Sequence, residues 1–167
     1  IRETAHIVSK DLGKEKGMIF PQLKRRNAIL TVIAPTGTLS ILADCSSGIE
    51  PLFARKYTKS VLNGIKLDMS SKYTTVDDSL LVVANEISIV KHIETQAAFQ
   101  MYTDSAVSKT INLANSAKIE DVAGAFLLAH KLGCKGLTVY RDGSRKAPLE
   151  STTEGELSEC EDKKCII

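Results

Sequence analysis

Residues 119–143 restrict the fold of this chain more than any other stretch, because a helix pattern leads directly into a strand pattern. Apolar residues recur at helical spacing and share one face of the predicted helix: Ile119, Val122, Phe126, and Ala129 or His130. Gly133 is a natural cap for its C-terminus. CKGLTVY (134–140) then predicts a strand, and RDGSR the turn that ends it. A helix followed at once by a strand is typical of βα units, so we expect an α/β fold with a parallel sheet.

Further elements follow from the same kind of pattern. We expect a polar helix at 1–17, a short buried strand at 28–35, a strand that ends at the Asn63-Gly64 turn, and a helix at about 89–106. The last rests on apolar residues at helical spacing, which are Val90, Ile93, Ala97 and Met101. Residues 68–88 fit either type of element. Beyond Lys146 the sequence loses all periodicity and reads as a flexible linker.

The charge of the chain is small overall but uneven. The net charge is +2, which is too small to argue for nucleic acid or a membrane surface as a partner. Residues 152–167 carry five acidic residues against two lysines, a charge of −3, so the remainder carries +5. That mild basic bias is compatible with an anionic ligand.

The distribution of apolar residues and cysteines bears on the compartment. No apolar run approaches the roughly 20 residues that span a bilayer, and residues 1–17 have no apolar segment of the secretory kind. The four cysteines, at positions 45, 134, 160 and 165, do not form the dense framework of a small secreted protein. We therefore expect a cytoplasmic chain that does not bind a membrane.

The stretch APTGTLS (34–40) is the first candidate site. Small hydroxyl residues around a glycine at the end of a strand present backbone amides and hydroxyls together, and such a nest binds phosphate oxygens. The Walker A pattern is absent. The alternative is that Pro35-Thr36-Gly37 is an ordinary turn between strand and helix. The neighbouring DCSSGIEP gathers further polar residues, namely Asp44, Ser46, Ser47 and Glu50. We interpret Cys45 and Cys134 as small core side chains.

The second candidate site is the terminal CEDKKC. Cys160 and Cys165 lie at the tip of an acidic segment, where an exposed dithiol can carry reducing equivalents by thiol–disulfide exchange. A zinc half-site is an alternative. Zinc would need two more ligands, and the three histidines, at 6, 92 and 130, are scattered without ligand spacing. We predict no metal site.

Four blocks in this order resemble one family. APTGTLSILADCSSGIEP is similar to the substrate phosphate-binding loop and adjoining strand of ribonucleotide reductase large chains, especially the adenosylcobalamin-dependent class. KHIETQAAFQMYTDSAVSKTINLAN, GCKGLTVYRDGSR and CEDKKC resemble later blocks of the same chains, the last being their swinging tail. Residues 60–90 match least.

This resemblance implies a fold and a role for each block. Residues 1–146 would form the C-terminal part of the ten-stranded α/β barrel, and 147–167 a disordered, redox-active tail. The substrate phosphates would be held by Pro35, Thr36, Gly37, Thr38, Leu39 and Ser40. Cys160 and Cys165 would reduce the active-site disulfide after each turnover, and thioredoxin or glutaredoxin would then reduce them.

The implied activity is reduction of ribonucleoside diphosphates to 2′-deoxyribonucleotides, with adenosylcobalamin bound by the complete enzyme. In this family a thiyl radical takes the 3′-hydrogen of the ribose, the 2′-hydroxyl leaves as water, and a cysteine pair supplies two electrons. The stretch that bears the radical cysteine, similar to N-P-C-G-E, is absent here. We therefore expect a partner, an N-terminal reductase chain that carries this cysteine.

Two other functions remain open from the sequence. The missing radical cysteine favours a phosphate- or nucleotide-binding module without catalysis of its own. The terminal cysteines favour a thiol-redox or zinc-binding domain.

Overall fold

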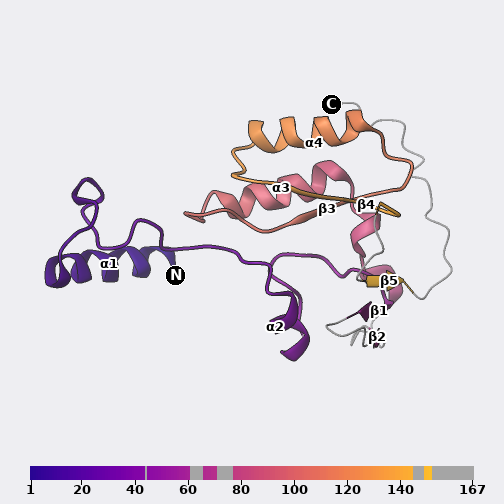
Figure 1. Ribbon diagram of the computed structural model, residues 1–167, viewed down its shortest axis with the longest axis horizontal. Coiled ribbons are helices and arrows are strands. Elements are labelled where there is room, and N and C mark those ends of the chain that lie inside the picture. The colour runs from indigo at the N-terminus through magenta and orange to yellow at the C-terminus, as the bar shows by residue number, and fades with distance from the viewer. Residues whose placement is uncertain (44, 61–65, 71–76, 145–148, 152–167) are drawn as a thin grey trace.

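The computed structural model describes residues 1–43, 45–60, 66–70, 77–144 and 149–151 (Figure 1). Its helices are α1 (Arg2–Lys16), α2 (Gly37–Leu42), α3 (Ile89–Gln100) and α4 (Ile119–Lys131), with short 3₁₀ helices at Pro21–Leu23, Asp78–Leu80 and Ala84–Glu86. Its strands are β1 (Lys56–Ser60), β2 (Lys66–Ser70), β3 (Thr110–Leu113), β4 (Thr138–Arg141) and β5 (Leu149–Ser151). The chain is therefore a mixed α/β structure.

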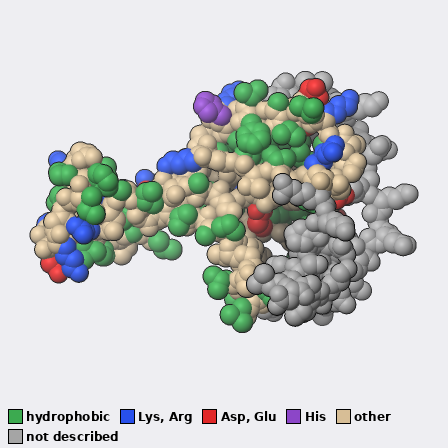
Figure 2. All heavy atoms as spheres, in the orientation of Figure 1, with side chains coloured by type: hydrophobic (Ala, Val, Ile, Leu, Met, Phe, Trp, Pro, Cys, Tyr) green, Lys and Arg blue, Asp and Glu red, His purple; other side chains and the backbone are tan. Residues whose placement is uncertain are grey.

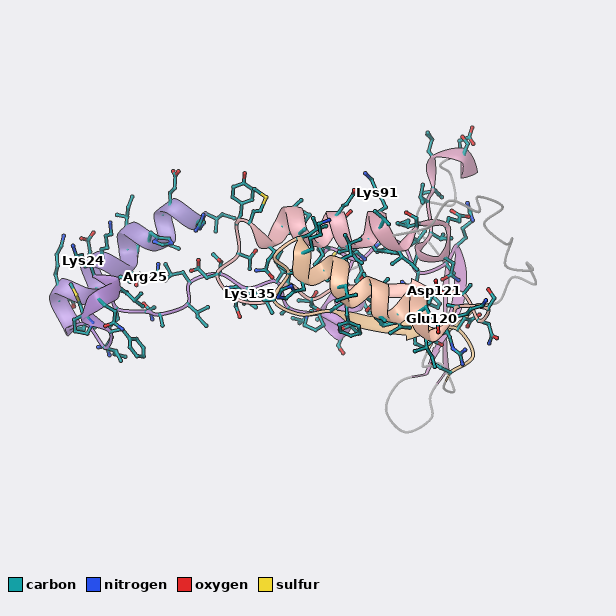
Figure 3. All side chains as sticks on the ribbon, turned by 90° about the horizontal axis from the view of Figure 1, so that it is seen from above. Lys24, Arg25, Lys91, Glu120, Asp121 and Lys135 are labelled. Atoms are coloured by element: carbon teal, nitrogen blue, oxygen red, sulfur yellow. The ribbon has the colours of Figure 1, made fainter. Side chains whose placement is uncertain are left out.

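A β3-α4-β4 unit forms the centre of the molecule. β3 pairs in parallel with β4, from Thr110 opposite Thr138 to Leu113 opposite Arg141. Helices α3 and α4 lie beside each other over this sheet (Figures 1 and 3). The core between these layers consists of Ile93, Ile111, Leu113, Ala125 and Ala129. The parallel βα unit predicted from residues 119–143 is confirmed, whereas β3 was not anticipated.

Helix α4 forms where the sequence predicts it, but it turns a different face inward. The Asp121 carboxylate accepts a hydrogen bond from the Lys118 amide at 2.7 Å and caps the N-terminus, and Gly133 has φ +78 beyond the C-terminus. The buried residues are small, namely Gly124, Ala125 and Ala129. These small residues let α4 approach the core closely, so Ile119 and Phe126 stay 83% and 50% exposed. The predicted apolar face is therefore confirmed for Val122 and Ala129 and wrong for Ile119 and Phe126. Figure 2 shows hydrophobic side chains exposed over α3 and α4.

Helix α3 begins at a serine cap and buries a largely polar face. The Ser88 hydroxyl accepts a hydrogen bond from the Lys91 amide at 3.2 Å. The buried residues are His92, Ile93, Gln96 and Gln100. The helix ends at Gln100 rather than near residue 106, because the Gln100 side chain donates to the carbonyls of Thr103 and Ser105 and turns the chain. Of the apolar residues at helical spacing, Ile93 is buried, whereas Val90 and Met101 are 37% and 70% exposed.

A second, antiparallel sheet has the strand order β2-β1-β5. Ser60 of β1 pairs with Lys66 of β2, which confirms a strand ahead of Asn63-Gly64. The turn itself lies outside the described residues. β5 pairs with β1, from Tyr57 opposite Ser151 to Lys59 opposite Leu149, and it falls within the segment 147–167 that the sequence predicts as the tail.

Residues 28–35 are extended but do not form the buried strand that the sequence predicts. The Ser105 and Ser108 amides donate to the carbonyls of Thr31 and Ile33, and Ile33 forms a parallel bridge with Val107. Ile29 and Val32 remain 59% and 62% exposed. The reason is that, within the part of the chain that the structure describes, this segment is bridged along one side only.

Helix α1 confirms the helix predicted at 1–17 and lies apart from α3 and α4 (Figure 1). Ser9 is buried and exchanges hydrogen bonds with Asn27, and its carbonyl accepts from the Arg26 amide at 2.8 Å. Gly13 is needed here because a Cβ atom would lie 3.1 Å from the Arg26 nitrogen. The helix thereby fixes the start of the extended segment that leads to residue 35.

Candidate functional site: a loop between two anchored segments

The predicted phosphate loop is a tight turn that leads into α2. Thr36 lies in the left-handed region, with φ 52 and ψ 27, and α2 begins at the next residue. A β-branched residue rarely adopts this conformation, so the surrounding structure must impose it. The Thr36 hydroxyl accepts a hydrogen bond from the Gly48 amide at 3.1 Å. The loop is thus more constrained than an ordinary turn.

The six predicted phosphate-binding residues lie together but differ in exposure. Pro35, Gly37, Thr38 and Leu39 are exposed, and Thr36 is half-buried. Ser40 is buried, and its hydroxyl donates to the Gly37 carbonyl at 2.8 Å. Residues 36–39 therefore present their backbone amides and the Thr38 hydroxyl toward the surface, while the Ser40 hydroxyl stabilises the turn.

A second loop, residues 47–50, is bound directly to the first. The Ser47 hydroxyl donates to the Pro35 carbonyl, and Gly48 donates to Thr36. Gly48 has φ +55, and a Cβ atom on it would lie 3.1 Å from the Ala34 carbonyl oxygen. A glycine is therefore required here for both conformation and space. The structure brings together Ser47 and Glu50 of the predicted polar cluster, whereas Asp44 lies outside the described residues.

Glu50 connects this second loop to the central sheet. Its carboxylate accepts from Lys109 Nζ at 2.9 Å and from the Thr110 amide at 2.5 Å. The Lys109 side chain is only 2% exposed, and Glu50 is 23% exposed. Sequence reasoning missed Lys109. A signal was present, because the alternation of Val107, Lys109, Ile111 and Leu113 places Lys109 on the buried face of a strand.

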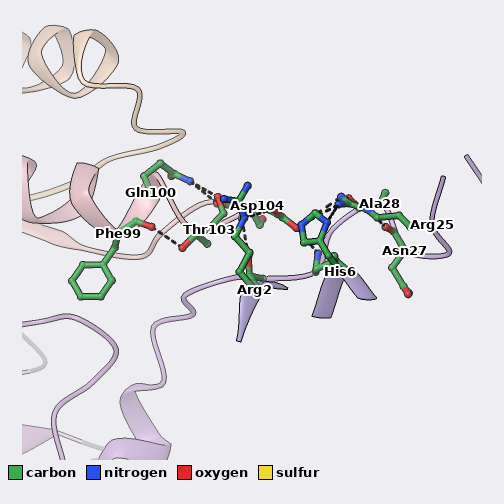
Figure 4. Close-up of polar contacts among 12 residues, drawn as sticks. Arg2, His6, Arg25, Asn27, Ala28, Phe99, Gln100, Thr103 and Asp104 are labelled. Atoms are coloured by element: carbon green, nitrogen blue, oxygen red, sulfur yellow. Dashed lines mark hydrogen bonds and ion pairs between the residues drawn. The ribbon is translucent and has the colours of Figure 1, made fainter. Parts of the chain in front are cut away.

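The segment before the loop is anchored by Asp104 (Figure 4). The Asp104 carboxylate accepts from the Leu30 amide at 3.0 Å, and the Asp104 amide donates to the Thr31 hydroxyl at 2.9 Å. Arg2 and Arg25 lie 4.0 and 3.9 Å from the same carboxylate. Figure 3 shows Arg25 beside α1 and Lys135 beyond the end of α4, where Lys135 Nζ donates to the Asp104 carbonyl.

The cysteines divide into two groups. Cys160 and Cys165, the predicted redox pair, lie outside the described residues. Cys45 is exposed, so its interpretation as a core side chain was wrong, because the chain turns back after α2 and places Cys45 on the surface. Cys134 is half-buried against the core, and this burial raises the pKa of its thiol. Among residues 1–43, 45–60, 66–70, 77–144 and 149–151, no three potential metal ligands of the His, Cys, Asp or Glu type gather.

None of the described helices has the length and apolar character needed to cross a membrane.

Comparison with known proteins identifies the family. The sequence profile of the ribonucleotide reductase barrel domain matches residues 14–80 and 65–140. The two matches meet inside the stretch 60–90, where the sequence departs most from the family blocks. A vitamin B12-dependent ribonucleoside-diphosphate reductase of Thermoplasma acidophilum is 35% identical over 99% of this chain. One of Mycobacterium tuberculosis strain H37Rv is 32% identical over 90% of this chain.

The chain spans 27% of the length of each of these two relatives. A solved structure, the Actinobacillus ureae class Id ribonucleotide reductase alpha subunit, superposes on 85% of this chain with a TM-score of 0.64 and 23% sequence identity. It supports the same fold for this part of the barrel. The matched profile, the two relatives and the shared fold agree, and the chain therefore belongs to the ribonucleotide reductase family through its barrel domain.

Proposed function

We propose that this chain supplies the substrate phosphate-binding loop and the dithiol tail of a ribonucleoside-diphosphate reductase. The observation that carries the proposal is the match to the reductase barrel domain across residues 14–140, which contains the constrained loop at 35–40. Relatives named ribonucleoside-diphosphate reductases support a diphosphate substrate. The chain spans 27% of the length of these relatives, and in this proposal an N-terminal reductase chain supplies the radical cysteine.

In this proposal the loop binds the phosphates of the nucleotide. Thr36, Gly37, Thr38 and Leu39, with Pro35 and Ser40, form the binding segment. Amides at the surface and the Thr38 hydroxyl donate to phosphate oxygens, and no lysine within the segment is required for that contact. The hydroxyl of Ser40 already donates to Gly37, so Ser40 supports the loop shape.

The tail would supply electrons to the complete active site. A thiolate of Cys160 or Cys165 attacks the active-site disulfide, and the second cysteine resolves the mixed disulfide, which leaves the active site as a dithiol and the tail as a disulfide. Thioredoxin or glutaredoxin then reduces the tail. A reducing compartment suits this chemistry and the exposed Cys45, so we also propose the cytoplasm as its location.

Adenosylcobalamin belongs to this proposal only through the complete enzyme. His92 Nδ1 and Gln96 Oε1 are buried polar atoms without a hydrogen-bond partner among the described residues. Both residues are 0% exposed, so a ligand of that size cannot reach them. These two atoms therefore do not contact the cofactor, and we assign no described residue of this chain to it.

The test of the loop is equilibrium binding of CDP, measured by calorimetry on a mixture of this chain with an N-terminal reductase chain. We expect binding by the wild-type mixture, and about tenfold weaker binding when Thr36→Val and Thr38→Val are combined. Thr95→Val, at a half-buried position of α3 outside the loop, is the matched control and should bind like the wild type. A folded mixture that binds no CDP would contradict the proposal.

A further inference from the structure

Lys109 is the most deeply buried charged side chain whose partner lies in another part of the described chain. It is 2% exposed, and its Nζ lies 2.9 Å from the Glu50 carboxylate and 3.2 Å from the Thr110 carbonyl. Placing an ammonium group in an interior carries a large desolvation cost, which a hydrophobic residue of similar volume would avoid. We therefore expect a functional reason for the burial of Lys109.

Residues 47–52, which include the second loop, offer that explanation, because they are held at three successive points. Ser47 and Gly48 bind Pro35 and Thr36 of the proposed phosphate loop. Glu50 binds Lys109 and the Thr110 amide at the start of β3.

The third point of attachment lies just beyond Glu50. The Leu52 carbonyl accepts from the Ala84 amide at 2.8 Å, and Leu52 forms a parallel bridge with Val83. The Ala84 carbonyl is in turn 3.0 Å from Nε2 of the buried His92 on α3. Residues 47–52 therefore form a strap that ties the proposed phosphate loop to β3 and α3, the most buried elements of the molecule.

We infer that Glu50 and Lys109 are positioning residues for nucleotide binding: through the strap, the buried ion pair fixes where Thr36 and its neighbours stand relative to β3. The inference deepens the proposed function and rests on it. Thr36 has a conformation that is unfavourable for its residue type, and only neighbouring contacts can hold it there. The Gly48 amide is one of these contacts, and Glu50 sets the position of Gly48 two residues along the chain.

Glu50 and Lys109 hold the loop in position and take no part in the chemical step. Neither Glu50 nor Lys109 is placed against the phosphates, and each acts through residues 47 and 48. If the Glu50–Lys109 ion pair is lost, the phosphate loop can still form, but it adopts its binding geometry for a smaller fraction of the time. The apparent affinity falls by that fraction. The chemical step of bound substrate should not change.

The test compares variants in the mixture of this chain with an N-terminal reductase chain. Lys109→Met alone leaves the Glu50 carboxylate partly buried and unpaired, and this variant can fail to fold. The double variant Glu50→Leu with Lys109→Met removes the ion pair without leaving a buried charge. Lys91→Met is the matched control, since Lys91 is 71% exposed and forms an ion pair with Glu94 on the same helix.

We expect the double variant to raise the KM and the dissociation constant for CDP about tenfold, with kcat changed less than about twofold. A pair that serves only stability would lower kcat through loss of folded enzyme and leave KM unchanged, and that result would overturn the inference. Lys91→Met should match the wild type in both constants.

Hydrogen exchange on the wild-type mixture gives a second measurement that needs no variant. Binding of CDP should slow exchange at the amides of Gly48 and Thr110 together, because the strap joins them. Slowing at residues 36–48 with no change at Thr110 would overturn the positioning role and leave the proposed function standing. A wild-type mixture that binds no CDP would overturn both.

Discussion

The hydroxyl of Thr36 accepts a hydrogen bond from the amide of Gly48 at 3.1 Å, and both residues have a left-handed backbone, with φ 52 and φ +55. This hydrogen bond joins the turn at Thr36, in the proposed phosphate loop, to the turn at Gly48, and it stabilises both turns. Only one of the two residues is a glycine, so the conformational strain is concentrated at Thr36.

The first prediction concerns Gly48→Ala. A Cβ atom would meet the Ala34 carbonyl oxygen at 3.1 Å in a backbone conformation that alanine rarely adopts. We expect a loss of about 2 kcal/mol in the free energy of unfolding, measured by urea denaturation. Gly136→Ala is the control, because a Cβ atom there has no neighbour within 4 Å. Equal stability of the two variants would show that the strap is not packed as described.

The second prediction concerns Gln96, which is 0% exposed. Its Nε2 donates to the Val107 carbonyl at 3.1 Å and to the Gly136 carbonyl at 2.7 Å, and so joins the segments that lead into β3 and β4. Gln96→Leu leaves both carbonyls without this donor, and we expect a loss of about 2 to 3 kcal/mol in chemical denaturation. Glu94→Ala, two residues away and exposed, should change stability by less than about 0.5 kcal/mol.

The third prediction is a pH dependence due to His92. Burial, and secondarily the charge of Lys109, lowers the pKa of His92 below its ordinary value of 6.5, against smaller opposing effects of the Ala84 carbonyl and Glu50. The unfolded chain therefore binds a proton at His92 at a higher pH than the folded chain does. Stability from this group is fully present above pH 6.5 and is lost as the pH falls below it.

The measurement is urea denaturation between about pH 7 and about pH 5. His92→Gln keeps a donor for the Ala84 carbonyl and should flatten this part of the pH profile. His130→Gln, at an exposed position of α4, should leave the wild-type profile intact. A profile of His92→Gln that runs parallel to the wild type would exclude His92 as the cause.

The fourth prediction concerns the tail. Cys160→Ser and Cys165→Ser should each reduce thioredoxin-driven turnover of the two-chain mixture to background, because one thiol cannot complete disulfide exchange. Turnover driven by dithiothreitol should persist, since a small dithiol reaches the active site unaided. Ser158→Ala in the same segment is the control. Equal losses with both reductants would contradict the shuttle role.

Local signals predicted the parts of the fold whose determinants lie close together in sequence. Helix α4, Gly133 and the strand after it are one such unit, because cap, periodicity and turn all fall within residues 119–143. The polar face of α3 could not be found in this way. Gln96 is buried where it donates to two carbonyls, and these partners lie 11 and 40 residues away in the sequence. The spacing of apolar residues cannot predict such long-range contacts.

In the candidate site, too, the sequence predicted the local motif but not the long-range contacts. The loop at residues 35–40 could be predicted as a compact motif, and the resemblance to the reductase family supported that prediction. Lys109 was not singled out, because the alternation of residues 107–113 indicates its burial but does not show its partner Glu50, which is 59 residues distant. Cys45 was misjudged because its residue type favours burial, whereas the turn after α2 decides its exposure.

The most direct measurement of the central claim is formation of deoxycytidine diphosphate from CDP with adenosylcobalamin and dithiothreitol. It should be run with this chain alone, with an N-terminal reductase chain that bears the radical cysteine, and with the two together. We predict product only in the mixture. Product in the mixture no greater than with the N-terminal chain alone, when both chains are folded, would contradict the account and favour a phosphate-binding module without catalysis.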